Sequence, residues 1–213
     1  PFFPRLSYPF ATRVVAPDCC DTGRWKKKQL SYPGYHELAY LHPNHFTPDV
    51  RVVDELCLSG GNDQLTEDPG GSQRLAVSGN YSTADPRLPT ADYFILRFAQ
   101  LTAHHDVGRN GISTETAREL IRILKPHGRI FITSERPLET EFEQYRIRIH
   151  PARIHHALAF ASLYIGDSQT MAAEAAVLGT PSIRFNDFVG QIGYLRDLEN
   201  RGLSIGIPAS QPD

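Results

Sequence analysis

The amino-acid sequence predicts an α/β fold, a Rossmann-like parallel sheet with helices on both faces. Apolar runs of strand length alternate with helical segments over residues 93–207. Residues 166–186 contain one unit of this pattern in full: a strand end, a polar turn, a helix, a glycine stop and a second strand. Repeated strand–helix–strand units imply parallel strands, because each helix returns the chain to the starting edge of the sheet.

The first strand and the first helix of this pattern have clear boundaries. Residues 93–99 are almost continuously apolar and predict a strand. An amphipathic helix is expected over residues 113–124, with Ser113 as its N-cap and Glu115 in its first turn. Residues 125–128 end this helix, because their proline and glycine interrupt helical structure.

The remaining elements continue the alternation. We expect, in chain order, a strand at residues 129–133, a short strand at 145–149, a helix at 151–160, a strand at 163–165, a helix after Ser168, a strand at 182–185, a helix at 191–201 and a last strand at 203–207.

The composition is that of a soluble globular protein. The chain has 213 residues, of which 40% are hydrophobic, so it can bury a core. Its longest apolar run, residues 157–165, is far shorter than the roughly 20 residues of a membrane span. No signal segment opens the chain, so we expect a cytoplasmic protein without a transmembrane segment. The net charge of -2 predicts no nucleic-acid partner.

The residues before the predicted sheet have a different character. Residues 57–92 are rich in Gly, Ser, Asp, Asn and Pro without apolar periodicity, which predicts a long flexible insertion. Residues 1–56 contain one possible strand, at residues 13–16, and an irregular segment rich in Tyr, His and Pro at residues 32–49. The only methionine is Met171, so we expect the sequence to be a fragment or a processed piece.

Polar residues follow the strand expected at residues 163–165. Ser168, Gln169 and Thr170 place hydroxyl groups and free backbone N–H groups at a helix start, where the helix dipole favours an anion. Glu174 lies four residues after Thr170 and so on the same helix face. The pattern predicts an anion pocket with a carboxylate beside it. The alternative is an ordinary strand–turn–helix in which Asp167 or Ser168 is only the N-cap.

The loop after the first expected strand, residues 102–111, is also rich in polar groups. Ligands of open parallel sheets bind beyond the carboxyl ends of the strands, where this loop begins. His104, His105 and Asp106 offer two imidazoles and a carboxylate, which suit acid/base catalysis or phosphate binding near neutral pH. We expect no metal site, because adjacent side chains diverge and no well-spaced further ligand follows.

Two arginines stand within expected strands, where an unpaired charge would be costly. Arg97 and Arg184 could bind a phosphate or a carboxylate near the crevice. They could equally form structural ion pairs with Glu135 or Asp187.

Other features carry less functional information. His155 and His156 lie in an expected apolar helix, and we interpret them as packed or surface side chains. No Gly-x-Gly-x-x-Gly, Walker-type or Gly-x-Ser-x-Gly motif occurs, which removes the main support for a dinucleotide, P-loop or hydrolase site.

Residues 166–186 resemble the nucleotide-sugar signature in the C-terminal domain of GT-B glycosyltransferases and non-hydrolysing UDP-N-acetylglucosamine 2-epimerases. In that superfamily the turn and helix start hold the UDP pyrophosphate, and a glutamate of the helix binds the ribose. The resemblance implies that Ser168, Gln169 and Thr170 bind the pyrophosphate and Glu174 the ribose, with Arg97 nearby. Gln169 and Thr170 stand where the epimerases usually carry glycines.

The loop at residues 102–111 is similar to the epimerase loop that carries an active-site histidine. The resemblance makes His104 or His105 its counterpart, with Asp106 beside it. Over about residues 13–56 and 93–213 the chain also resembles an uncharacterised GT-B-like family, which shares the phrases at residues 32–43 and 103–108.

The resemblance implies a division of the chain into four parts. Residues 1–30 would be the remnant of an N-terminal domain, 31–56 an interdomain segment, 57–92 the insertion and 93–213 the nucleotide-sugar-binding domain. The implied function is the UDP-sugar-binding half of a GT-B-type glycosyltransferase, with the UDP-sugar as substrate and no cofactor. A 2-epimerase-like enzyme and a non-catalytic binding or assembly module are the alternatives. Because GT-B catalysis takes place between two domains, this chain alone is expected to be inactive.

Overall fold

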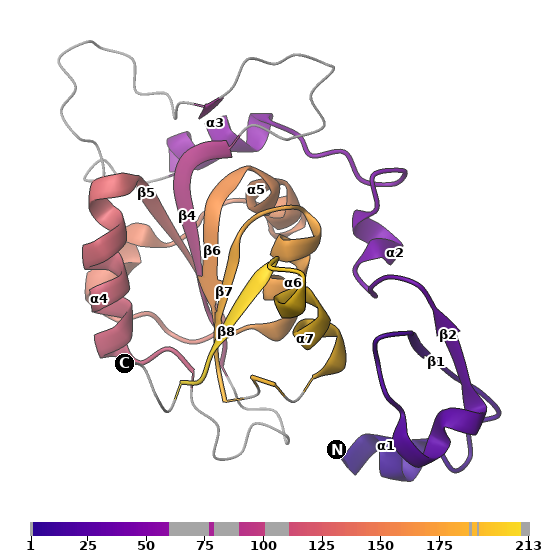
Figure 1. Ribbon diagram of the computed structural model, residues 1–213. Coiled ribbons are helices and arrows are strands. Elements are labelled where there is room, and N and C mark those ends of the chain that lie inside the picture. Colours follow the sequence, from indigo (N-terminus) through magenta and orange to yellow (C-terminus); the bar gives the residue numbers. More distant parts are fainter. Residues whose placement is uncertain are drawn as a thin grey trace, which may run out of the picture.

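The computed structural model describes residues 2–59, 77–78, 90–100, 111–187, 189–190 and 192–209. It confirms the predicted α/β fold with a Rossmann-like parallel sheet (Figure 1). Five strands run parallel in the order β5-β4-β6-β7-β8, and β3 pairs antiparallel with the start of β4. The strands are β3 (Val77–Ser78), β4 (Thr90–Phe98), β5 (Arg129–Ser134), β6 (Ala161–Gly166), β7 (Ser182–Phe185) and β8 (Ser204–Ile207).

The prediction of a strand at residues 145–149 is wrong. The chain forms the short 3-10 helix η4 (Thr140–Tyr145) and then makes a single parallel bridge, between Arg146 and Ile132. Ile147 N–H donates to the Ile132 carbonyl over 2.9 Å, and this hydrogen bond accompanies the bridge. The alternating Arg and Ile residues therefore touch the edge of β5 without extending the sheet.

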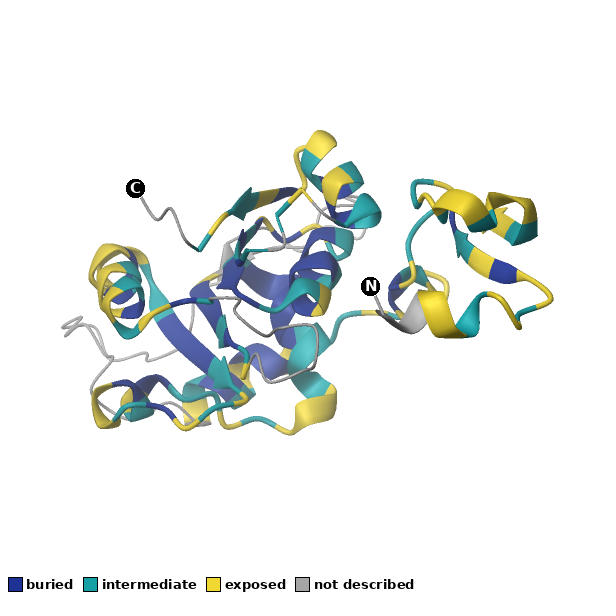
Figure 2. Cartoon of the chain, turned by 90° about the horizontal axis from the view of Figure 1, so that it is seen from below, coloured by how far each residue is buried: buried dark blue, intermediate teal, exposed yellow. Residues whose placement is uncertain are grey.

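Helices cover both faces of the sheet. The helix α4 (Thr114–Leu124) packs on one face, and α5 (Ile154–Phe160), α6 (Gln169–Val177) and α7 (Gly193–Asn200) lie on the other (Figure 1). Because strand side chains alternate, Tyr93 and Ile95 of β4 enter the core under α5 and α6, whereas Phe94 enters the core under α4. Buried residues accordingly concentrate in the sheet and on the inner helix faces (Figure 2).

The predicted cap of α4 is confirmed. The Ser113 hydroxyl accepts a hydrogen bond from Thr116 N–H over 3.1 Å, and Glu115 lies in the first turn. The helix ends in the 3-10 turn η3 (Lys125–His127) and Gly128. Each signal at the two ends of this helix is local, which is why the sequence defines it well.

The N-terminal residues form more structure than the sequence predicts. The expected strand is present as β1 (Val14–Pro17), and it pairs in parallel with β2 (Gln29–Tyr32). The helix α1 (Phe2–Ser7) precedes this pair, and the 3-10 helix η1 (Gly23–Lys28) connects its strands. The Lys28 ammonium donates to the carbonyls of Tyr8, Pro9 and Ala11 and so holds the turn after α1 against this connection.

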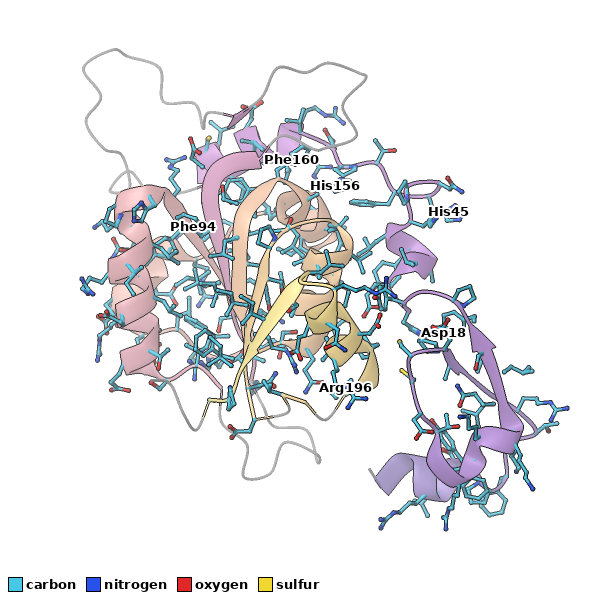
Figure 3. The ribbon with its side chains drawn as sticks, viewed as in Figure 1. Asp18, His45, Phe94, His156, Phe160 and Arg196 are labelled. Carbon is cyan, nitrogen blue, oxygen red and sulfur yellow. The ribbon has the colours of Figure 1, made fainter. Side chains whose placement is uncertain are left out.

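Residues 33–49, here called the arm, run from β2 along α6 and α7 to α3 (Arg51–Ser59) (Figure 1). The arm contains the short helix α2 (Leu38–Leu41). At its end, Asp49 N–H donates to His156 Nδ1 over 3.0 Å, and the Phe46 and His156 ring centroids are 4.8 Å apart. Figure 3 labels His156 on α5 and His45 of the arm. The helix α3 then buries its apolar face in the core beneath α5. No helix in the described ranges is long and apolar enough to cross a membrane.

Candidate functional site

The candidate site lies at the carboxyl edge of the sheet, where neighbouring strands send the chain to opposite faces. From β4 the chain continues to α4 on one face, and from β6 it continues to α6 on the other. Such a switch point leaves a crevice between the two connections, and ligands of open α/β sheets bind there.

A cleft of about 580 Å³ opens beside this point. Its walls come from the ends of β4 and β5, from the start of α6 and from α5 with the segment before it. Its polar lining consists of Arg97, Thr133, Ser134, Glu135, Arg146, His155, Ser168, Thr170 and Glu174. Its apolar lining consists of Ile132, Ile147, Ile149, Pro151, Ile154 and Met171.

The start of α6 contributes Ser168 and Thr170 to the cleft. Ser168 is the N-cap of this nine-residue helix, and its Oγ accepts a hydrogen bond from Met171 N–H over 3.4 Å. Ser168 is therefore the N-cap, as the alternative interpretation of this segment predicted. Its hydroxyl accepts in the cap and still has its own proton to donate to a ligand. Gln169 begins the helix but is not part of the cleft lining.

Asp167 has a role that the sequence did not suggest. It is buried, and its carboxylate accepts hydrogen bonds from Ala99 N–H over 2.6 Å and from Ile112 N–H over 3.3 Å. Burial raises the pKa of Asp167 to about 6, although these backbone donors favour the charged form. One carboxylate thus fixes both ends of the loop that follows β4. The sequence signal that could have indicated this role is the position of an acidic residue directly after a buried central strand.

Glu174 lies on the α6 wall of the cleft with two partners. Its Oε1 atom accepts a hydrogen bond from the Tyr40 hydroxyl over 2.8 Å and lies 3.1 Å from His155 Nε2. Desolvation, followed by this hydrogen bond to Glu174, raises the pKa of Tyr40. His155 was expected to be a packed or surface side chain; it packs against the Tyr40 and Phe46 rings and also lines the cleft. Tyr40 was missed as a site residue, because it stands in the irregular segment rich in Tyr, His and Pro at residues 32–49.

Arg97 reaches the cleft from the end of β4 in an ion pair. Its guanidinium donates to Glu135 and to the Thr133 hydroxyl, the latter over 2.7 Å. Its buried Nε atom has no hydrogen-bond partner among the described residues. The predicted ion pair with Glu135 is therefore present, and Arg97 also lines the cleft.

Arg184 belongs to the structural core. It is 1% exposed, and it pairs with Glu199 over 2.8 Å and donates to the Asn186 side chain over 3.3 Å. Glu199 lies on α7, so the expected charge compensation comes from an acidic residue that the sequence analysis did not consider.

Close packing beside Arg97 requires a glycine. Gly166 of β6 pairs with Arg97 of β4 in the parallel register. A Cβ atom on Gly166 would lie 2.7 Å from the Arg97 Cβ and 2.3 Å from the Tyr164 hydroxyl. Any larger residue at this position would push the Arg97 side chain away from its place in the cleft.

His104, His105 and Asp106 lie outside the described residues. The structure describes the two ends of this loop, Ala99 and Ile112, which both donate to Asp167. In the described part of the chain, no group of three His, Cys, Asp or Glu side chains could hold a metal ion.

The described site residues form two functional groups. Hydroxyl and N–H donors at the start of α6 can bind an anion, and Glu174 can accept hydrogen bonds from hydroxyl groups one helical turn away. Comparison of the chain with protein-family models, curated proteins and solved structures finds no match.

Proposed function

We propose that the chain binds a UDP-sugar in this cleft, as the nucleotide-sugar-binding half of a GT-B-type glycosyltransferase. One observation carries the proposal: Ser168, Thr170 and Glu174 line one wall of a single cleft, with Arg97 in the same lining. Anion donors, a hydroxyl acceptor and a cation are the groups that a nucleoside diphosphate requires.

The spacing along α6 suits a nucleoside diphosphate. Four residues of helix rise by about 6 Å, so Glu174 lies about one turn beyond the helix start. A pyrophosphate at the N-terminus of α6 would accept from its backbone N–H groups and from the Ser168 and Thr170 hydroxyls. The ribose would then reach Glu174, whose carboxylate accepts from hydroxyl groups.

Arg97 and the apolar lining supply the remaining contacts. The Arg97 guanidinium lines the cleft, so its charge can attract a phosphate while the Glu135 pair persists. Ile147, Ile149 and Ile154 offer an apolar surface to a planar base. His104, His105 and Asp106 are the proposed acid/base residues, because they follow β4 in the sequence and their side chains suit proton transfer near neutral pH.

The N-terminal strands support a larger two-domain assembly. Parallel strands are normally covered on both faces. In the β1–β2 pair, Val15 is 68% exposed and Leu30 is 52% exposed. These apolar side chains are consistent with the proposal that residues 1–30 belong to the sheet of an N-terminal domain.

Thermal unfolding with a panel of nucleotides tests the proposal. UDP at about 100 times its dissociation constant should stabilise the protein by roughly 2.7 kcal/mol. UDP, UDP-glucose and UDP-N-acetylglucosamine should raise the melting temperature, and uridine without phosphates should have little effect. Absence of a shift with every nucleotide up to millimolar concentration would contradict the proposal.

A non-catalytic binding module is the second candidate. It is favoured because Arg97 is already paired with Glu135, and Glu174 with Tyr40 and His155. Because this chain alone is expected to be inactive, the full-length two-domain protein is incubated with UDP-N-acetylglucosamine to separate the alternatives. Release of UDP indicates a transferase, deuterium uptake at C2 indicates an epimerase, and binding without either product indicates a module.

A further inference from the structure

The Glu174 carboxylate is held by two side chains from distant parts of the sequence. Tyr40 comes from the arm and His155 from α5, and both contact the same oxygen, Oε1. Oε2 accepts no hydrogen bond from the described residues. One oxygen is therefore used for positioning, and the other remains for a ligand in the cleft that Glu174 lines.

Ring contacts hold the two partners in place. The Tyr40 and His155 ring centroids are 5.6 Å apart, and Phe46 of the arm lies 6.3 Å from His155 in an edge-on arrangement. A glutamate has three rotatable side-chain bonds, so a free carboxylate would occupy several orientations. The Tyr40 hydrogen bond and the His155 imidazole 3.1 Å away favour one orientation of the carboxylate before a ligand arrives, which lowers the entropic cost of binding.

We infer that Tyr40 and His155 are positioning residues, which hold Glu174 so that its free oxygen receives a hydroxyl of a ribose diol. This inference rests on the proposed function and deepens it, because it makes the arm a part of the ribose subsite. Discrimination between ribose and deoxyribose then depends on a residue 134 positions away from Glu174 in the sequence.

The Tyr40 hydroxyl is not needed to attach the arm. The Tyr35 hydroxyl donates to Asp197 over 2.6 Å, and Asp49 pairs with Arg153 over 3.0 Å, so the arm is fixed on both sides of Tyr40. The Tyr40 side chain is itself 42% exposed and contributes little to the core. Removal of its hydroxyl should therefore change the Glu174 orientation and leave the arm in place.

A nearby acidic group makes these donors more important. Glu37 at the start of α2 is buried, and its Oε2 atom has no hydrogen-bond partner among the described residues. Burial raises the pKa of Glu37, and the charge of Glu174 adds to this effect. The Tyr40 hydroxyl donates to Glu174 Oε1, which offsets the repulsion between these two carboxyl groups and favours the orientation of Glu174 toward the cleft.

The test compares Tyr40→Phe with the matched control Tyr35→Phe. Both variants remove one hydroxyl of the arm that donates to a carboxylate, but only Tyr40 contacts a residue of the cleft. Affinities are measured for UDP, 2′-deoxy-UDP, 3′-deoxy-UDP and inorganic pyrophosphate. Unfolding curves verify that the variants are folded.

We expect the wild-type protein to prefer UDP over one or both deoxy compounds by about tenfold, the size of one hydrogen bond to a charged group. Tyr40→Phe should lose most of this preference and keep its pyrophosphate affinity, and Tyr35→Phe should keep both. His155→Leu should behave like Tyr40→Phe, and His155→Gln, which retains a donor, should recover part of the preference.

The inference is overturned if Tyr40→Phe keeps the full preference for UDP, or if Tyr35→Phe loses as much of it. A wild-type protein that binds UDP without preference over either deoxy compound overturns the inference and leaves the proposed function standing. A wild-type protein that binds no nucleotide overturns both.

Discussion

At the scale of single residues, the site depends on how each polar side chain is used. Ser168 caps α6 and faces the cleft, Asp167 is turned away from the cleft to bind backbone N–H groups, and Glu174 is held by its partners. Sequence position alone could not separate these roles, because Asp167 and Ser168 are adjacent and both suit a helix start. Burial decides between them: Asp167 is buried, whereas Ser168 lines the cleft.

Replacement of Glu174 by Ala should weaken the binding of UDP more than the binding of inorganic pyrophosphate. The substitution removes the proposed acceptor for the ribose hydroxyls and leaves the proposed phosphate donors of α6 in place, so UDP should bind about tenfold more weakly. Titration calorimetry with both ligands measures the two losses. Glu115→Ala, an exposed change on α4 outside the cleft, is the control. Equal losses for UDP and pyrophosphate would refute the ribose role.

Asp167 should make the protein more stable as the pH falls. Its pKa is about 6 in the folded protein, against an ordinary value of 3.8, so the folded state binds this proton more tightly than the unfolded state. The free energy of unfolding should therefore decrease as pH rises from about 4 to about 6, by up to about 3 kcal/mol for this group. Urea unfolding of the wild type and of Asp167→Asn across this range gives the difference. Two parallel stability curves would exclude the effect.

At the scale of elements, sequence prediction succeeded where the signals are local. The helix α4 has its cap, first-turn acid and stop in consecutive residues, and it forms as predicted. The strand expected at residues 145–149 does not form, because Arg146 pairs with Glu143 over 2.6 Å and makes a single bridge to β5. The helix α3 was missed because its nine residues are too few to show a clear period, and packing against α5 stabilises it.

Replacement of Ser113 by Ala should destabilise the fold through α4. The change leaves the N–H group of Thr116 without its capping acceptor, which costs about 1 kcal/mol. The same substitution at Thr116 keeps that backbone donor capped and serves as the control. Urea unfolding measures both variants. A Ser113→Ala protein as stable as the wild type would show that water replaces the cap without loss.

At the scale of the whole molecule, the sequence predicts the sheet but does not predict the path of the arm. Alternating apolar runs were sufficient to predict a parallel sheet and to place Ser168, Thr170 and Glu174 at its carboxyl edge. The contact between Tyr40 and Glu174 joins segments that no local pattern relates, and it depends on the path of the arm along α6. Long-range contacts of this kind require the folded chain, because neither residue has a neighbouring signal for its partner.

We propose above all that a nucleoside diphosphate occupies the cleft at the start of α6. Nuclear magnetic resonance of the isotope-labelled protein, titrated with UDP, tests it most directly because it reports where the ligand binds. We expect saturable shifts of the Ser168, Thr170 and Glu174 amides and of the Arg97 Nε–H group. No saturable shift up to millimolar UDP, or shifts confined to a surface away from these residues, would contradict it.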